Sequence, residues 1–177
     1  MTYTQHYDSP LGGILLAADE EGLTGLWFDG QKYFARTLPK EYAESEMPVL
    51  CEAKRWLDIY FSGREPDFTP PLHPVGSAFR QAVWALLLEI PYGETTTYGA
   101  LARKLAEKQG LTHMSAQAVG GAVGHNDISL IIPCHRVVGA SGSLTGYAGG
   151  VDKKIKLLEL ERADMKSFFV PKKGTAL

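Results

Sequence analysis

Cysteine is scarce in this chain of 177 residues, which contains only Cys51 and Cys134. Two cysteines cannot form the disulfide framework of a small secreted domain, so a reducing compartment is expected. No apolar run approaches the roughly 20 residues that cross a bilayer. The first residues also lack the basic and then apolar profile of a signal peptide. These absences favour a cytoplasmic protein, or a nuclear one in a eukaryote, without a membrane partner.

The chain also lacks a large excess of charge of either sign, because its formal net charge is only -2. Apolar residues make up 45% of the chain and charged residues 21%, which is typical of a globular protein and excludes a disordered tail, a collagen-like chain and a coiled coil. The charge is unevenly spread: residues 1–78 hold 6 basic and 12 acidic residues, and residues 79–177 hold 12 and 8. A basic half argues weakly for a nucleic-acid partner, since cations displace counterions from phosphates. From composition alone, an unevenly charged solvated surface is the better explanation.

The N-terminal part reads as a small α/β unit over residues 1–61. Residues 13–18 and 23–28 have the composition of short strands joined by a hairpin turn, and residues 47–61 place apolar side chains at helical spacing. Cys51 lies on this helix, where we interpret it as a small buried residue. Four of the ten prolines fall in residues 62–76, which predicts an extended linker there.

The second part is predicted to be mainly helical. Ser77 is placed to cap a helix that ends before Pro91, Thr96 or Thr97 to cap a second, and Ser115 to cap a third. Two short helices with a brief loop between them match a helix-turn-helix pattern, which many helix pairs that merely pack together also match.

The third of these helices, over residues 116–123, is rich in alanine and glycine. Each glycine costs a helix about 1 kcal/mol relative to alanine, but small side chains let another backbone approach closely. The residues themselves leave two partners open, a neighbouring helix and a sugar-phosphate chain.

Cys134 is followed by His135 and Arg136. A free thiol has a pKa near 8.5, so a nucleophilic cysteine needs a base or a cation nearby, and these two neighbours are candidates. An inert buried cysteine beside two polar residues is the alternative. Metal binding is disfavoured, because no second cysteine is near and His113 and His125 do not have zinc-ligand spacing with this pair.

Six segments together resemble the O6-alkylguanine-DNA alkyltransferases, also called methylated-DNA–protein-cysteine methyltransferases. They are residues 79–84 (FRQAVW), 91–98 (PYGETTTY), 118–122 (AVGGA), 133–137 (PCHRV), 146–150 (GYAGG) and 157–161 (LLELE). The resemblance implies a small ribonuclease-H-like α/β domain followed by a mainly helical DNA-binding and catalytic domain with a helix-turn-helix. That second domain would span residues 77–162, with a C-terminal extension at 163–177.

The resemblance implies repair of double-stranded DNA with neither a metal nor an organic cofactor, and a monomer is the simplest oligomeric state to expect. A guanine with an O6-alkyl group would be flipped out of the stack, and Cys134 would accept the alkyl group once and irreversibly. His135 would remove the thiol proton through water, Glu161 would orient His135, and Tyr98 would give a proton to the leaving guanine.

The resemblance also implies a base pocket and a DNA-binding face. Asn126 would be the hinge between the recognition helix and the active-site strand, Val137, Tyr147 and Ala148 would line the pocket, and Lys154 would lie beside it. The residues expected to contact DNA are Thr97, Tyr98, Ser115, Ala116, Gln117, Gly120 and Gly121. O4-alkylthymine stays open as a second substrate.

Two features depart from the family pattern. Gln117 stands where the family usually has an arginine that fills the space left by the flipped base, so we expect weaker and more salt-tolerant DNA binding. Residues 163–177 run past the matched region; we expect Phe168 and Phe169 to pack on the core and the following Lys172-Lys173-Gly174 to be mobile. The rival interpretations are a non-catalytic member that only binds alkylated DNA, which Cys134 argues against, and a thiol enzyme for small substrates.

Overall fold

The computed structural model describes residues 1–171, and its contacts divide the chain into two compact units. The first contains residues 1–75 and the short segment 127–131, and the second contains residues 76–126 and the chain from residue 132 onward. The predicted boundaries at 61, 62–76 and 77 stay a prediction, because a grouping of contacts does not measure independent folding.

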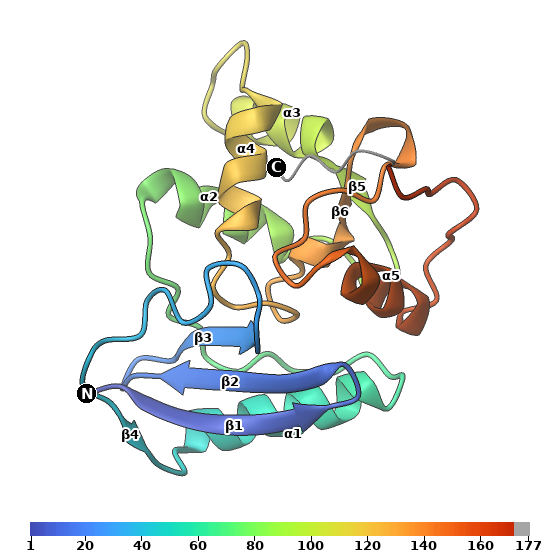
Figure 1. Cartoon of the computed structure of the whole chain (residues 1–177). Helices are drawn as coiled ribbons and strands as arrows, with labels where there is room; N and C mark the ends of the chain where they lie inside the picture. Colours follow the sequence, from blue (N-terminus) through green and yellow to red (C-terminus); the bar gives the residue numbers. More distant parts are fainter. Residues whose placement is uncertain (172–177) are drawn as a thin grey trace. The chain divides into compact units, whose positions relative to one another are not determined.

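The first unit is a four-stranded sheet with the order β3-β2-β1-β4 (Figure 1). Strands β1 (Tyr3–Ser9), β2 (Gly12–Ala18) and β3 (Leu23–Phe28) form an antiparallel meander, and β4 (Ala43–Glu44) pairs parallel to β1. The predicted strands at 13–18 and 23–28 are confirmed. The sequence analysis did not predict β1, because only Thr4 in it is buried and the strand carries no apolar run.

Helix α1 (Pro48–Phe61) packs on this sheet through one apolar side. The buried residues of the helix are Leu50, Ala53, Trp56, Leu57 and Tyr60. The interpretation of Cys51 as buried was wrong, since its thiol is exposed. Each residue advances an α-helix by about 100°, so the residue after Leu50 is turned away from the buried stripe.

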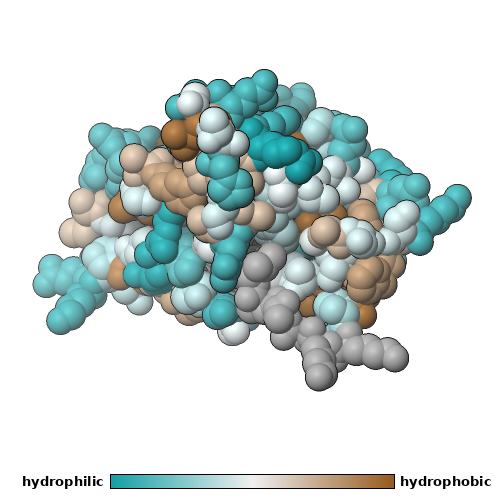
Figure 2. Space-filling view, turned by 90° about the horizontal axis from the view of Figure 1, so that it is seen from above, coloured by the Kyte–Doolittle hydropathy of each residue, from teal (hydrophilic) through white to brown (hydrophobic). Residues whose placement is uncertain are grey.

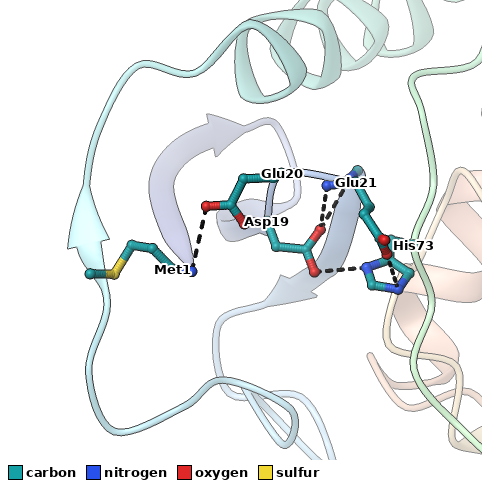
Figure 3. A network of polar contacts seen from close by, with 6 residues as sticks. Met1, Asp19, Glu20, Glu21 and His73 are labelled. Atoms are coloured by element: carbon teal, nitrogen blue, oxygen red, sulfur yellow. Dashed lines mark hydrogen bonds and ion pairs between the residues drawn. The ribbon is translucent and has the colours of Figure 1, made fainter.

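The turn between β2 and β3 is tied to residues 71–73 of the proline-rich segment. Leu23 donates a backbone hydrogen bond to Pro71 and accepts one from His73. The His73 ring also contacts Asp19 Oδ2 through Nδ1 at 2.7 Å and Glu21 Oε2 through Nε2 at 2.8 Å (Figure 3). Burial opposes ionisation of Asp19, but backbone N–H donors and His73 outweigh it and lower the pKa of Asp19.

The second unit contains helices α2 (Ala78–Leu87), α3 (Tyr98–Lys108), α4 (Ala116–Gly124) and α5 (Val151–Leu160). Three predicted N-caps are confirmed: the side chains of Ser77, Thr97 and Ser115 accept backbone N–H bonds at 3.2, 3.1 and 3.1 Å, respectively. The two-residue strands β5 (Thr96–Thr97) and β6 (Val137–Val138) pair in parallel. Two short 3₁₀ turns, η1 (Cys134–Arg136) and η2 (Ala140–Gly142), lie immediately before and after β6 in the chain that leads to α5.

The small residues of α4 serve helix packing on one side and leave an open surface on the other. Val119, Gly120, Ala122 and Val123 are buried against α2 and α3, and the Trp84 indole donates a 2.9 Å bond to the carbonyl of Ala122. A Cβ added at Gly121 would meet no atom within 4 Å. Of the two partners left open by the sequence, the neighbouring helix therefore accounts for only part of this composition.

The chain after α5 packs back on the second unit as far as it is described. Phe168 packs against Val138, Leu144 and Leu158, as expected. For Phe169 the expectation was wrong, because its backbone bonds to residues 142 and 144 while its side chain is 49% exposed. Lys172, Lys173 and Gly174 lie outside the described residues. Within residues 1–171, no helix has both the length and the apolar character needed to cross a membrane.

Candidate active site

The η1 turn places Cys134 in the interior of the second unit. Cys134 is 6% exposed. The backbone just before it is fixed by hydrogen bonds to the carbonyl oxygen of Ile132. This oxygen accepts a 2.8 Å bond from the backbone N–H of Cys134 and another 2.8 Å bond from the Asn126 side chain. Asn126 therefore connects the end of α4 with the segment that enters η1, as a hinge residue would.

Cys134 is a thiol rather than a thiolate in the resting protein. Burial raises its pKa, and this effect outweighs a hydrogen bond from Asn126, the charge of Lys154 and two backbone donors. The cation that favours the thiolate is thus Lys154, from the α5 helix, and not the adjacent Arg136, which binds elsewhere. A buried thiol with a raised pKa becomes a nucleophile only if a base removes its proton.

His135 and Arg136 both bind Glu161, the residue that follows the last turn of α5. The Nε2 of His135 lies 2.5 Å from Oε2 of Glu161, and Nε of Arg136 donates a 2.8 Å bond to Oε1. Burial opposes the charge of Glu161, but His135 and Arg136 outweigh it and hold its pKa below the ordinary range. Burial lowers the pKa of His135 despite Glu161. The pair is therefore a neutral imidazole on a carboxylate, which is the resting state of a general base.

Tyr98 and Lys154 are held by the same stretch of backbone. The Tyr98 hydroxyl donates to the carbonyls of Thr145 and Gly146 at 3.3 and 3.4 Å, and Lys154 Nζ donates to Val137 and Thr145 at 2.5 and 2.8 Å. Burial and then the charge of Cys134 raise the pKa of Tyr98. Burial lowers the pKa of the fully buried Lys154 to about 8, although Cys134 opposes the shift.

The residues expected to line a base pocket lie around this group. Val137 is fully buried and the Tyr147 ring centroid is 6.4 Å from that of His135, while Ala148 is half-buried. Lys154 is the residue that the sequence signalled least, because a lysine on an amphipathic helix is normally solvated. Within residues 1–171, no three His, Cys, Asp or Glu side chains are grouped to hold a metal ion.

The residues expected to contact DNA lie at the start of α3 and along α4, with the two glycines in the middle of α4. Thr97 caps α3, and Ser115, Ala116 and Gln117 form the exposed start of α4. Gly121 is on the outer side of that helix and Gly120 on the packed side. Helix α4 carries no acidic residue, so nothing on it repels a phosphate.

A groove of about 560 Å³ runs beside this start, between α3 and the α3–α4 loop. Its lining combines the charged Arg103 and Glu107 with the apolar Leu111. Figure 2, which looks down on the molecule from above, shows hydrophobic patches broken by hydrophilic side chains. A surface of this mixed kind offers both apolar and polar contacts.

Both parts of the chain match domains of one known family. Residues 2–74 match the ribonuclease-like domain of 6-O-methylguanine DNA methyltransferase, and residues 78–163 match its DNA-binding domain. A relative from Methanosarcina acetivorans, named methylated-DNA–protein-cysteine methyltransferase, is 45% identical over 160 residues, which are 90% of this chain and 97% of the relative. The chain belongs to the 6-O-methylguanine DNA methyltransferase family.

Further methyltransferases of this family agree with the assignment. A Haemophilus influenzae relative of the same name is 42% identical over 161 residues, covering 90% of this chain and 86% of its own. The crystal structure of Mycobacterium tuberculosis OGT in complex with DNA is 41% identical, with a TM-score of 0.78 and coverage of 91% and 94% of the two chains. The similarity confirms the predicted fold class, a ribonuclease-like α/β domain followed by a mainly helical DNA-binding domain.

Proposed function

We propose that this protein repairs double-stranded DNA by transferring the alkyl group of O6-alkylguanine to Sγ of Cys134. The observation that carries this proposal is the contact between His135 and Glu161 beside the buried thiol, with Nε2 and Oε2 at 2.5 Å. The thiol is protonated because burial raises its pKa, and the neighbouring base is what turns it into a nucleophile.

In the proposed reaction, the thiol proton moves through a water molecule to His135. Because Nε2 is bound to Glu161, the proton goes to Nδ1, and the carboxylate stabilises the imidazolium that forms. The sulfur then forms a bond to the alkyl carbon as the bond from that carbon to O6 breaks, and the electron pair stays with guanine. At this point the alkyl group is on sulfur, the thiol proton is on His135, and the guanine anion takes its proton from Tyr98. The imidazolium proton then restores the Tyr98 hydroxyl through solvent, so that the net change exchanges one proton and one alkyl group between sulfur and guanine.

Tyr98 is proposed to give the proton that the leaving guanine needs. Burial and the charge of Cys134 raise its pKa, so the hydroxyl keeps its proton at neutral pH and is present as a donor. Lys154 is proposed to stabilise the thiolate by its charge, and Val137, Tyr147 and Ala148 to contact the flipped base. The product is a thioether, which thiols do not reduce, so each molecule reacts once.

DNA is proposed to bind across the start of α3 and the outer side of α4, through Thr97, Ser115, Ala116, Gln117 and Gly121. Gly120 is buried on the opposite side of α4 and is proposed only to let the helix pack closely. Gln117 can hydrogen-bond an orphaned cytosine but lacks the charge of an arginine. We further propose that the protein acts as a monomer in the cytoplasm, or in the nucleus of a eukaryote. O4-alkylthymine is proposed as a second substrate.

The test is mass spectrometry of the protein after incubation with a duplex oligonucleotide that contains one O6-methylguanine. We expect one added methyl group on the Cys134 peptide, no uptake by Cys134→Ala, and full uptake by Cys51→Ser, which removes the exposed thiol. An unmodified Cys134 peptide with tight DNA binding would support a non-catalytic binder instead. A parallel duplex with O4-methylthymine tests the second substrate.

A further inference from the structure

Arg136 is buried next to the proposed base, and the reaction steps above do not use it. The side chain is about 9% exposed. Its Nε donates to Oε1 of Glu161 at 2.8 Å and its Nη1 donates to the carbonyl of Ile90 at 2.8 Å. The guanidinium also lies 5.6 Å from the centroid of the Tyr92 ring. Arg136 is thereby fixed between the chain that follows α2 and the end of α5.

We propose that Arg136 is a positioning residue for alkyl transfer, which binds Oε1 of Glu161 so that Oε2 is directed at His135. The proposal rests on the proposed function of this site. Oε1 also accepts a 3.1 Å bond from the backbone N–H of Gly93. Two donors therefore engage one carboxylate oxygen, and the other oxygen holds the imidazole.

The geometry of the loop at residues 90–93 supports this role. Gly93 has a φ of +79°, and a Cβ added there would lie 3.0 Å from the backbone oxygen of Glu161. The loop thus fits closely against the end of α5. Since Arg136 is bonded to Ile90 in the same loop, its planar fork connects the loop, the carboxylate and the η1 turn in one arrangement.

The charge of Arg136 has a second effect, on the proton affinity of the base. Among the charged and titratable groups that face His135, Glu161 favours its protonated form, and Arg136 and Lys154 disfavour it. The others are Cys134 on the same turn and the Tyr147 ring, 6.4 Å away between centroids. Without Arg136, the negative charge of the desolvated Glu161 would no longer be balanced by a neighbouring cation. The pKa of His135 would then rise, and the His135–Glu161 pair would keep a proton up to a higher pH. The imidazole would then be occupied at neutral pH and unable to accept the thiol proton.

The experiment compares wild type, Arg136→Met and Arg136→Lys, with Lys156→Met as a control that removes an exposed cation. The rate of methyl uptake from the O6-methylguanine duplex is measured from pH 5 to pH 9, normalised to the total methyl uptake of each variant. In Arg136→Met, the acid limb of the profile moves to higher pH. At a fixed pH on this limb, the rate falls about tenfold for each pH unit by which the limb moves. Arg136→Lys keeps the wild-type limb because it keeps the charge, at a lower plateau because it loses the fork.

A second readout does not depend on the reaction. NMR titration of the His135 ring without DNA, assigned with His135→Gln, shows a higher midpoint in Arg136→Met than in wild type. Coincident midpoints and acid limbs, with only a uniformly lower rate, would overturn the proposal and leave Arg136 a purely structural role. If wild type takes up no methyl group at any pH, the proposed function fails, while the titration still decides the effect of Arg136 on the base.

Discussion

Lys154 allows a quantitative prediction about stability, because it is fully buried and its pKa falls from 10.5 to about 8. The shift corresponds to a cost of about 3 kcal/mol for the charged form. Between these two pKa values the unfolded chain binds more protons than the folded one, so stability rises with pH. For this group alone, the free energy of unfolding should rise by about 2 kcal/mol from pH 7 to pH 9.5.

Lys154→Met removes this titration and also leaves the carbonyls of Val137 and Thr145 without their lysine donor. The loss of those bonds costs about 1–3 kcal/mol each at every pH. Relative to wild type, the variant should therefore lose about 2 kcal/mol between pH 7 and pH 9.5. The sign follows from the wild-type protein gaining stability over this range while the variant does not.

Urea denaturation at half-unit pH steps measures this difference. Both proteins carry Cys134→Ser, because burial raises the pKa of this thiol and its ionisation would add a second pH dependence to the stability. Lys156→Met is the matched control, since this exposed lysine of the same helix should give a difference that does not change with pH. Parallel stability curves for wild type and Lys154→Met would refute the assignment of Lys154 as a charged buried group.

Three further predictions concern other parts of the chain. Gln117→Arg should tighten binding of lesion DNA and steepen the plot of log K against log salt by about 0.9, and an unchanged slope contradicts the role given to this residue. Ser115→Ala should lower the free energy of unfolding by about 1 kcal/mol in urea denaturation, because α4 loses its N-cap bond; no change would mean that another group caps the helix. Asp19→Asn should cost up to about 1 kcal/mol at pH 7. The difference in stability between wild type and Asp19→Asn should fade below about pH 4. The reason is that the pKa of Asp19 is lowered in the folded protein, so the stability it supplies is lost as pH falls. A difference that stays constant with pH would argue against the contact with His73.

Local capping rules predict helices α2, α3 and α4 of the second unit. Ser77, Ser115 and either Thr96 or Thr97 were placed as N-caps from the residues that follow them, and the structure shows the expected backbone bonds at Ser77, Thr97 and Ser115. Strand β1 escaped prediction because it has little apolar character. Cys51 was misplaced because residue type indicates average burial, whereas the rotation of the helix decides burial at one position.

By itself, the sequence determined the family, the order of the helices and the cysteine that is proposed as the nucleophile, since motifs and caps are local properties of the chain. Only the tertiary structure decided how the charges are paired. It brings Glu161 to His135 across 25 intervening residues of chain, turns Arg136 away from the sulfur toward that carboxylate, and buries Lys154 against two carbonyls. The physical reason is that desolvation and charge pairing depend on distances through space, which residue spacing along the chain does not contain.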